Sequence, residues 1–267
     1  FGGNLTIKNL TLMMNSTTDS EFQIEVLTGG SFYINDIDND NVTTDDASNI
    51  TAYNTDYEYL FWVRDGSNFT MKNSELHECG YSLLQGLRIQ TDNALIEDNL
   101  ISNNFDGIYL DGSNASIKNN SIVLNTGVGV DIWASSYSFI YGNNMSSNIG
   151  GGMYSDSSTP TIINNSVKFN GNGLSGVGIV CAINSNAIIR NNNISYNDDD
   201  GIFCLLSSPQ ISNNTLLDNN FGIVTSGGSN PTIENSTIVN SVTNDFYIGG
   251  NSHPVTINST YNVTSVY

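Results

Sequence analysis

Isoleucine and other apolar residues recur along this chain at intervals of about 22 residues. Seven segments align when their starts are spaced by 21, 23, 22, 27, 22 and 22 residues. Each segment carries an isoleucine two positions after its start and a second apolar residue seven positions after it. The seven segments begin at Ala94, Ala115, Ser138, Pro160, Ala187, Pro209 and Pro231.

A polar position follows ten residues into each segment, and six of the seven segments have Asn there. These residues are Asn104, Asn125, Asn148, Asn170, Asn197 and Asn219. Asn tolerates the left-handed backbone of tight turns, and stacked Asn amides can hydrogen-bond along a column. We therefore predict a structural Asn column at a turn, followed by Gly-apolar pairs such as Gly107-Ile108 and Gly129-Val130.

A unit of this length, with short apolar alternations and a fixed polar turn, predicts a parallel β-solenoid in which each unit is one coil. A helical solenoid would need longer stretches of 3.6-residue period, and a leucine-rich repeat would need Leu-x-Leu spacing. We predict a single all-β domain over 1–267 with about ten to eleven coils. The most regular coils are expected at 94–253, and an irregular insertion or lobe is expected at 31–67.

The repeat resembles that of right-handed parallel β-helix proteins, most clearly at Ile117–Ile122, at Ile211–Leu216 and at the Gly-apolar pairs. The resemblance covers about 94–253 and implies a right-handed parallel β-helix. That family includes carbohydrate-cleaving enzymes, phage tailspikes and adhesin-like surface proteins of bacteria and archaea. The Asn-rich, Lys-poor character of this chain looks most like the secreted adhesin-like proteins.

Composition narrows the possible partners. The chain has 7 Lys and Arg against 26 Asp and Glu, for a formal net charge of −19. Binding to a phosphate backbone needs cations, so nucleic acid is excluded as a partner. No apolar run reaches the roughly 18 residues of a membrane span. Asn accounts for 42 of the 267 residues.

Polysaccharide hydrolysis needs two carboxylates facing a groove, and two sets of Asp residues are candidates. One set is Asp198–Asp200 with Asp218 one coil later, for which a solvated acidic turn is the simpler interpretation. The other set is Asp106 with Asp111 and Asp131.

Two related activities have weaker sequence support. The resemblance to pectate-type lyases implies an Asp calcium cluster with a basic residue, but Arg88 and Arg190 occupy different columns. The resemblance to polygalacturonases implies Gly-His-Gly, which is absent around His77 and His253. We assign no catalytic residue from the sequence.

Asp36, Asp38 and Asp40 occupy positions one, three and five of a loop, as in the start of an EF-hand. The twelfth position is Ala47 rather than Glu. We predict no cofactor other than a calcium ion at these three residues, with an acidic surface insertion as the alternative.

Two further clusters admit two interpretations each. Tyr57, Tyr59 and Phe61 alternate, so they form either an exposed sugar platform or a packed interior. Cys181 and Cys204 occupy equivalent places in successive units. We predict a stacked pair of buried thiols there, at a spacing that a disulfide would also fit.

Many Asn-x-Ser/Thr sequons occur, each a possible glycosylation site in a secreted protein. Asn119, Asn164, Asn213 and Asn235 fall in the repeat's own turn and are excluded if their amides stack inward. We predict glycosylation at Asn4, Asn68, Asn258 and Asn262.

The functional prediction from the sequence is a non-enzymatic, extracellular or cell-surface structural protein, adhesin-like and glycosylated. Open solenoid ends expose unpaired strand edges, so we expect them to be covered by flanking domains of a longer chain or by other copies in a fibre or layer. The alternative is a carbohydrate-active enzyme or sugar-binding module, tailspike-like proteins included, with glycans as partners and with Asp198–Asp200 or Arg88 near the site.

Overall fold

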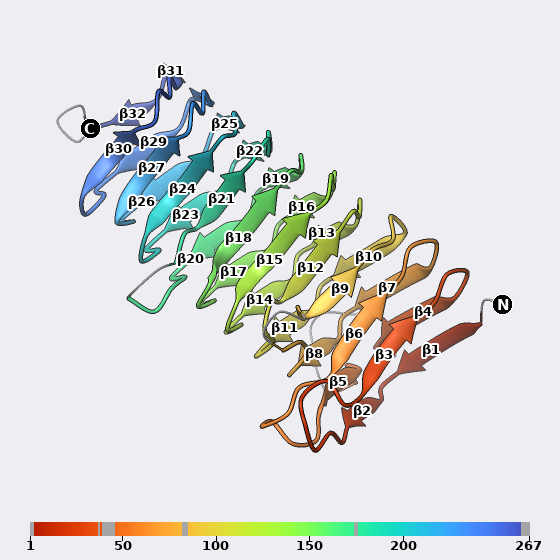
Figure 1. Ribbon diagram of the computed structural model, residues 1–267. Helices are drawn as coiled ribbons and strands as arrows, with labels where there is room; N and C mark the ends of the chain where they lie inside the picture. Colours follow the sequence, from red (N-terminus) through yellow and green to blue (C-terminus); the bar gives the residue numbers. More distant parts are fainter. Residues whose placement is uncertain (1–2, 37, 39–45, 82–84, 174–175, 263–267) are drawn as a thin grey trace.

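The computed structural model describes residues 3–36, 38, 46–81, 85–173 and 176–262. These residues form a solenoid in which the chain passes through three parallel sheets in turn, so that each coil adds one strand to each sheet (Figure 1). The sheets contain 11, 11 and 10 strands, in agreement with the predicted fold and number of coils. Among the described residues we find no helix with the length and apolar character needed to cross a bilayer.

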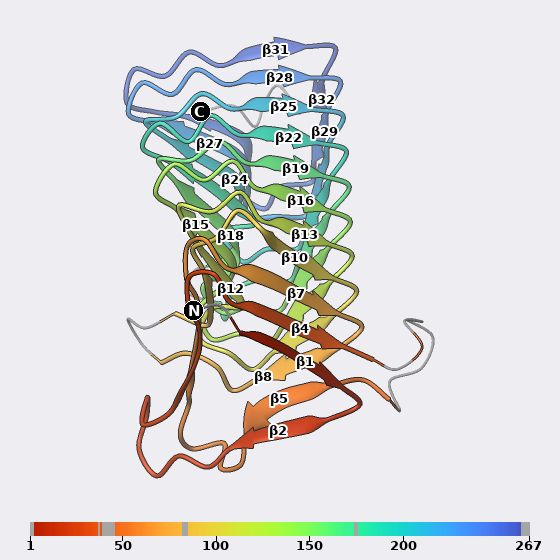
Figure 2. The same ribbon diagram turned by 90° about the vertical axis from the view of Figure 1, so that its right-hand side faces the viewer.

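The strands of sheet A stack in one flat layer (Figure 2). Sheet A contains β1 (Asn4–Lys8), β4 (Ser31–Asn35), β7 (Asn68–Lys72), β10 (Ala94–Glu97), β13 (Ser116–Lys118), β16 (Phe139–Tyr141), β19 (Thr161–Ile163), β22 (Ile188–Arg190), β25 (Gln210–Ser212), β28 (Thr232–Glu234) and β31 (Val255–Ile257). Sheet B contains β2 (Thr11–Met14), β5 (Asn49–Ala52), β8 (Glu75–His77), β11 (Leu100–Ser102), β14 (Ser121–Val123), β17 (Asn144–Ser146), β20 (Ser166–Lys168), β23 (Asn193–Ser195), β26 (Thr215–Leu217), β29 (Thr237–Val239) and β32 (Thr260–Tyr261). Sheet C contains β3 (Gln23–Val26), β6 (Leu60–Val63), β9 (Leu87–Ile89), β12 (Ile108–Asp111), β15 (Val128–Trp133), β18 (Gly151–Asp156), β21 (Ile179–Ala182), β24 (Asp200–Leu205), β27 (Phe221–Ser226) and β30 (Asn244–Ile248).

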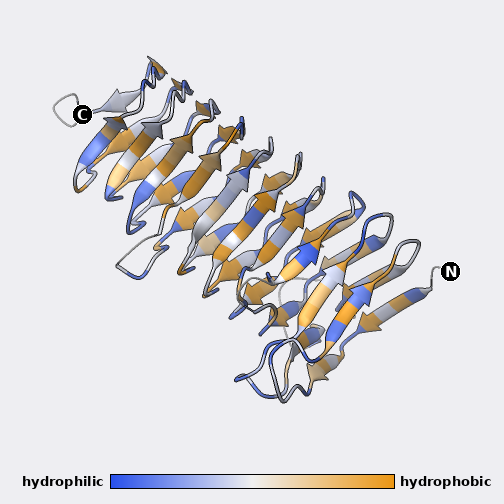
Figure 3. Ribbon diagram, in the orientation of Figure 1, coloured by the Kyte–Doolittle hydropathy of each residue, from blue (hydrophilic) through white to orange (hydrophobic). Residues whose placement is uncertain are grey.

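The recurring apolar residues point into the solenoid and stack on their equivalents in the next coil. Ile96 is paired with Ile117, and Ile101 with Ile122. All four side chains are fully buried, and hydrophobic positions recur along the whole length of the solenoid (Figure 3). Since successive residues of a strand point to opposite faces, these inward residues also fix which residues of each strand face outward.

The predicted Asn column is a buried ladder at the turn between sheets B and C. Asn125 donates from its main-chain nitrogen and from Nδ2 to Oδ1 of Asn148, at 3.1 and 2.8 Å. The Nδ2 of Asn148 in turn donates to the main-chain oxygen of Ile122 at 3.1 Å and to Asn170 Oδ1 at 3.2 Å. Each amide therefore satisfies polar groups on two neighbouring coils.

A second Asn ladder lies at the turn between sheets A and B. Its members are Asn99, Asn120, Asn143, Asn165, Asn192 and Asn214. In the turns of Asn119-Asn120, Asn164-Asn165, Asn191-Asn192 and Asn213-Asn214 the second residue is buried, whereas the first adopts a left-handed conformation and is exposed. The inward orientation considered for the sequons Asn119, Asn164, Asn213 and Asn235 is therefore wrong.

Glycine in the repeated Gly-apolar pairs makes room for the ladder. A Cβ added at Gly129 would lie 2.6 Å from the main-chain oxygen of Gly152 and 2.9 Å from Asn148 Nδ2. The same close approach to the next coil occurs at Gly178 and Gly201. The buried Asn side chains of the ladder therefore require glycine at the neighbouring position of sheet C, where a Cβ would collide with them.

Within 31–67 the chain makes a coil of β4, β5 and β6 with longer connections than in the repeats downstream. Phe61 packs against Phe32 and Phe69, with ring centroids 6.0 and 5.5 Å apart. Tyr59 is fully buried, and its hydroxyl donates to the main-chain oxygens of Ile50 and His77. Tyr59 and Phe61 therefore belong to the interior rather than to an exposed sugar platform.

We predict that Asn148→Ala destabilises the fold by about 3 kcal/mol or more, because it leaves buried donors and acceptors on two coils unpaired. The matched control is Asn144→Ala at an exposed position of β17, which should change the free energy of unfolding by less than about 0.5 kcal/mol. Urea denaturation followed by circular dichroism measures both. Equal losses in the two variants would contradict a stabilising role for the ladder.

Candidate functional site

The outer face of sheet C carries aromatic, acidic and basic side chains side by side between β6 and β18. The strand register places Trp62, Arg88, Tyr109, Asp131 and Tyr154 in one column, one residue per coil. A second column, two positions further along the strands, contains Asp111 and its partner Trp133. We call the set the sheet C cluster; its members are Trp62, Arg88, Asp106, Tyr109, Asp111, Asp131, Trp133, Tyr154 and Asp156.

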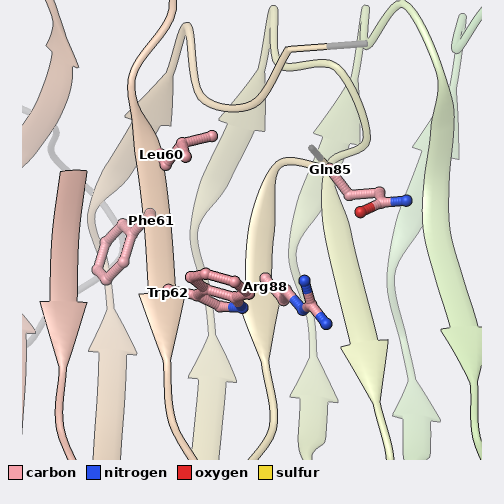
Figure 4. Close-up of a pocket in the computed structure, with 5 residues that line it drawn as sticks. All are labelled: Leu60, Phe61, Trp62, Gln85 and Arg88. Atoms are coloured by element: carbon pink, nitrogen blue, oxygen red, sulfur yellow. The ribbon is translucent and has the colours of Figure 1, made fainter. Parts of the chain in front are cut away.

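Arg88 is held between aromatic rings and a carboxylate. Its guanidinium lies 4.4 Å from the ring centroid of Trp62 and 5.6 Å from that of Tyr109. Figure 4 shows Trp62 and Arg88 beside each other on neighbouring strands. Arg88 Nη2 donates to Asp111 Oδ2 at 2.5 Å, and Gln90 Nε2 donates to the same oxygen at 2.9 Å.

The second cation of this face is also paired. The Arg64 guanidinium lies 3.5 Å from the Trp62 ring centroid, and its Nε lies 2.5 Å from Glu25 Oε1. Trp62 therefore lies between two guanidinium groups, each of which has its own carboxylate partner. This arrangement fixes the indole ring at one end of the sheet C cluster.

Asp131 lies at the centre of the cluster and is 9% exposed. Its Oδ1 accepts a hydrogen bond of 2.7 Å from Trp133 Nε1, and the Trp133 ring lies 5.4 Å from the ring of Tyr154. Burial, reinforced by the negative charge of Asp106, raises the pKa of Asp131 to about 7. Asp131 thus retains its proton at mildly acidic pH.

The pKa values of the two other carboxyl groups close to Asp131, those of Asp106 and Asp111, move in opposite directions. Burial raises the pKa of Asp106 to about 6, although the main-chain nitrogen of Val128 donates to its Oδ1 at 2.8 Å. Partial burial acts to raise the pKa of Asp111 as well. The hydrogen bonds from Arg88 and Gln90 and the charge of Arg88 outweigh this effect, and the pKa of Asp111 is lowered.

Asp111 and Asp131 are thus diagonal neighbours on adjacent coils with pKa values that move in opposite directions. A coil spacing of about 4.8 Å and two residues of strand rise put their Cα atoms roughly 8 Å apart. Neighbouring titratable groups whose pKa values are driven apart are the usual sign of an acid and a base in one active site. In this arrangement Asp131 can donate a proton to a bound molecule, and Asp111 can accept a proton from it.

The structure separates the other candidate carboxylates. Asp198 and Asp218 line one surface hollow, together with Tyr196 and Val242. Asp200 lies on β24 and is 8% exposed, and burial followed by the charge of Asp199 raises its pKa to about 7. Asp111 and Asp131, by contrast, lie on the outer face of sheet C, and Asp106 lies in the turn before β12, where it accepts from the main-chain nitrogen of Val128.

Sequence reasoning did not identify Tyr154 or Asp156 as members of a site. Tyr154 donates from its hydroxyl to Asp156 Oδ2 at 3.3 Å, and Ser157 Oγ donates to Asp156 Oδ1 at 2.6 Å. Their shared signal is position: each lies one or three residues after an inward apolar residue of the Gly-apolar strand. That signal is visible only when the coils are aligned by this strand.

Part of the expected calcium site can be described. Asp36, Asp38 and Asp46 place one carboxylate oxygen each within 4.8 Å of one another, and Asp36 is buried. Asp40 lies outside the described residues, and Asp46 takes the third position in the described cluster. Calcium binding there stays a prediction.

The remaining predicted residues have clear positions. Cys181 and Cys204 are register partners on β21 and β24, and both are fully buried free thiols. Asn4, Asn68, Asn258 and Asn262 are exposed. Exposure permits glycosylation at these four residues, and the modification stays a prediction.

The comparisons with known proteins agree on the fold. A family model described as right handed beta helix region matches residues 59–176 and 170–261. No curated protein sequence matches this chain.

Several solved structures are similar to this one at low sequence identity. The periplasmic alginate epimerase AlgG has a TM-score of 0.62 at 16% identity, over 92% of this chain and 65% of the epimerase. Pectate lyase Pel9A has a TM-score of 0.54 at 15% identity, over 98% of this chain and 68% of the lyase. The Dettilon tailspike protein has a TM-score of 0.52 at 15% identity, over 99% of this chain and 62% of the tailspike.

These similarities show the fold alone, and this chain spans about two thirds of the length of AlgG. The similar structures are two carbohydrate-active enzymes and a tailspike. They do not support the expected resemblance to adhesin-like surface proteins, nor a glycoprotein or filament.

We predict that Asp131→Asn makes stability less dependent on pH. The raised pKa of Asp131 stabilises the fold fully below the unfolded value of about 3.9, and this contribution is lost as the pH rises to about 7. Thermal unfolding should therefore show that the free energy of unfolding of the variant rises relative to that of the wild type between pH 5 and pH 8, by an amount on the order of 2 kcal/mol. Asp65→Asn, at an exposed site, is the control and should not reproduce this gain. A variant curve parallel to the wild-type curve would contradict the buried proton.

Proposed function

This chain belongs to the right handed beta helix family, and we propose that it binds a polysaccharide on the outer face of sheet C and hydrolyses its glycosidic bonds there. The observation that carries the proposal is the Asp131–Asp111 pair, one carboxyl protonated and the other ionised over the same pH range. The pair lies among aromatic rings on a continuous, partly exposed face.

Glycoside hydrolysis of the inverting type uses one carboxylic acid and one carboxylate with the sugar between them. In this site Asp131 donates its proton to the glycosidic oxygen as the bond from that oxygen to the anomeric carbon breaks. Asp111 accepts a proton from the water whose oxygen bonds to the anomeric carbon. Inverting enzymes hold their carboxyl groups about 6.5–9.5 Å apart, which leaves room for this water. The Cα atoms of Asp111 and Asp131 lie roughly 8 Å apart, and the proposal requires their carboxyl groups to lie within this range.

The surrounding side chains have supporting roles. Trp133 orients the acid by donating to Asp131 Oδ1, and Arg88 keeps Asp111 ionised. Tyr109 and Tyr154 offer ring surfaces and hydroxyl groups for sugar contacts, since aromatic side chains combine an apolar surface with polar groups.

The names of similar structures lend further support, because AlgG is an alginate epimerase and Pel9A a pectate lyase. The structural, adhesin-like function expected from composition has no comparable support. The extracellular or cell-surface location stays a prediction, and so does assembly with other copies or flanking domains.

We expect the protein to release new reducing ends from at least one polysaccharide, with kcat lowered about 10²-fold or more in Asp131→Asn and in Asp111→Asn. Asp198→Asn removes an exposed carboxylate from the separate surface hollow and should leave kcat unchanged. The measurement is a reducing-sugar assay over a panel of neutral and acidic polysaccharides. Products with a new carbon–carbon double bond would instead indicate elimination. Loss of activity in Asp198→Asn would indicate that the active site lies at the surface hollow and not at the sheet C cluster.

We also expect the rate to depend on pH through the same two groups. Activity requires the proton of Asp131, so it should fall as the pH rises through about 7. On the acid side it should persist below the ordinary Asp pKa of about 3.9, because the pKa of Asp111 is lowered. A kcat/KM profile for a soluble oligosaccharide measures both limbs. An alkaline limb well below pH 6 would exclude Asp131 as the acid.

A further inference from the structure

We infer that the polysaccharide is uncharged and that it extends from the sheet C cluster along the solenoid axis, over β21, β24, β27 and β30. This inference rests on the proposed function and specifies its substrate class. It follows from two features of sheet C, the apolar character of its outer face beyond β18 and the distribution of cations along its strands.

The column that contains Arg88, Tyr109, Asp131 and Tyr154 continues without a break into apolar residues. The register pairs Tyr154 with Val180, Val180 with Phe203, Phe203 with Val224 and Val224 with Tyr247. Leu205 lies two positions beyond Phe203 on the same face. We call this surface the apolar strip; its members are Val180, Phe203, Leu205, Val224 and Tyr247.

The other two faces of the same coils mix polar and apolar residues. Sheet A presents Ile188 with Arg190, Gln210 and Ser212, and sheet B presents Leu217 and Val239 with Asn193, Thr215 and Thr237. The apolar strip differs from both because one column of sheet C is apolar or aromatic in four successive coils. Because the strip and the sheet C cluster occupy one column of one sheet, a chain bound at the cluster can continue onto the strip without leaving the surface.

The strip is also the part of the face that has no cation. No Lys or Arg occurs in β15, β18, β21, β24, β27 or β30. The two cations of the face, Arg64 and Arg88, are paired with Glu25 and Asp111. A uronate polymer on this surface would meet the carboxyl groups of Asp131 and Asp156 and a net charge of −19, without an unpaired cation to compensate its own charges.

A bridging calcium ion is the usual way in which an acidic surface holds an acidic polymer, and it requires converging carboxylates. Within the described part of the chain, Asp36, Asp38 and Asp46 are the group of three that brings its oxygens within 4.8 Å. Asp106, Asp131 and Asp156 do not converge in that way. Arg88 of the sheet C cluster is paired with Asp111, and the carboxylates of the cluster do not converge. An uncharged sugar chain therefore fits this face, with apolar faces of its sugar rings on Phe203 and Tyr247 of the apolar strip.

The first experiment measures binding rather than cleavage. The Asp131→Asn protein, which keeps the proposed surface but loses the acid, is titrated by affinity electrophoresis with β-glucan, xylan, mannan and dextran, and with polygalacturonate and alginate. We expect at least one neutral polymer to bind at least about tenfold more tightly than either uronate polymer, with or without calcium. Uronate binding that equals or exceeds the best neutral polymer, or that appears on adding calcium and vanishes with EDTA, would overturn the inference. So would failure of every neutral polymer to bind.

The second experiment tests the strip itself. The double variant Phe203→Ala/Tyr247→Ala should weaken binding of the neutral polymer by about tenfold while leaving a trisaccharide of the same sugar unaffected, because the short ligand occupies only the cluster. The control is Phe139→Ala/Tyr141→Ala, which removes a stacked, exposed ring pair from the outer face of sheet A. Circular dichroism and thermal unfolding establish that both variants are folded.

The outcomes separate this inference from the proposed function. Cleavage of a neutral polymer with no change in the Phe203/Tyr247 variant would refute the strip and leave hydrolysis standing. Strip-dependent binding of a neutral polymer without cleavage would refute hydrolysis and leave the substrate class standing. An equal loss of binding in the sheet A control would show that the effect is not specific to sheet C.

Discussion

The buried amide ladders are the interaction on which the rest of this structure depends. At two of the three turns of each regular coil, one Asn side chain enters the interior and hydrogen-bonds to the coils on both sides, as Asn148 does with Asn125 and Asn170. An unpaired amide in that position would cost the full penalty of a buried polar group. A coil therefore cannot shift by one residue relative to its neighbours without breaking a ladder, and the register of all three sheets follows from this constraint.

Register is also what creates the site. Arg88, Tyr109, Asp131 and Tyr154 are separated by 21, 22 and 23 residues in the sequence, and none of them is in a recognisable motif. The ladders bring them into one column, and the ion pair of Arg88 with Asp111 and the bond from Trp133 to Asp131 then set two carboxyl groups in opposite protonation states. The ladders are buried, whereas the outward residues that they align can be replaced one coil at a time.

The sequence predicts the inside of this solenoid better than its outside for the same reason. Ile96, Ile117 and Ile140 form a column because each must fill the same interior space, so their spacing alone identifies the fold. No such requirement acts on an outward position, and Tyr154 or Asp156 has no recurrence by which it could be recognised. The Asn-Asn turn shows the limit of pattern reading. Both residues recur, but only the backbone conformation distinguishes the exposed Asn164 from the buried Asn165.

The distribution of charge on sheet C has an energetic cost that the ladders make tolerable. Asp106, Asp131 and Asp200 are all less than one tenth exposed, and burial raises the pKa of each. Ionising any of them at neutral pH opposes folding. Additional Lys or Arg residues on the same strands would relieve this cost by pairing with the carboxylates, but they would also lower the pKa of Asp131 and remove the acid. A face that must keep a proton near neutral pH is therefore constrained to remain poor in cations, and a surface poor in cations selects against an anionic polymer. Under the proposed function, the protonation state of Asp131 and an uncharged substrate are two consequences of the same scarcity of cations.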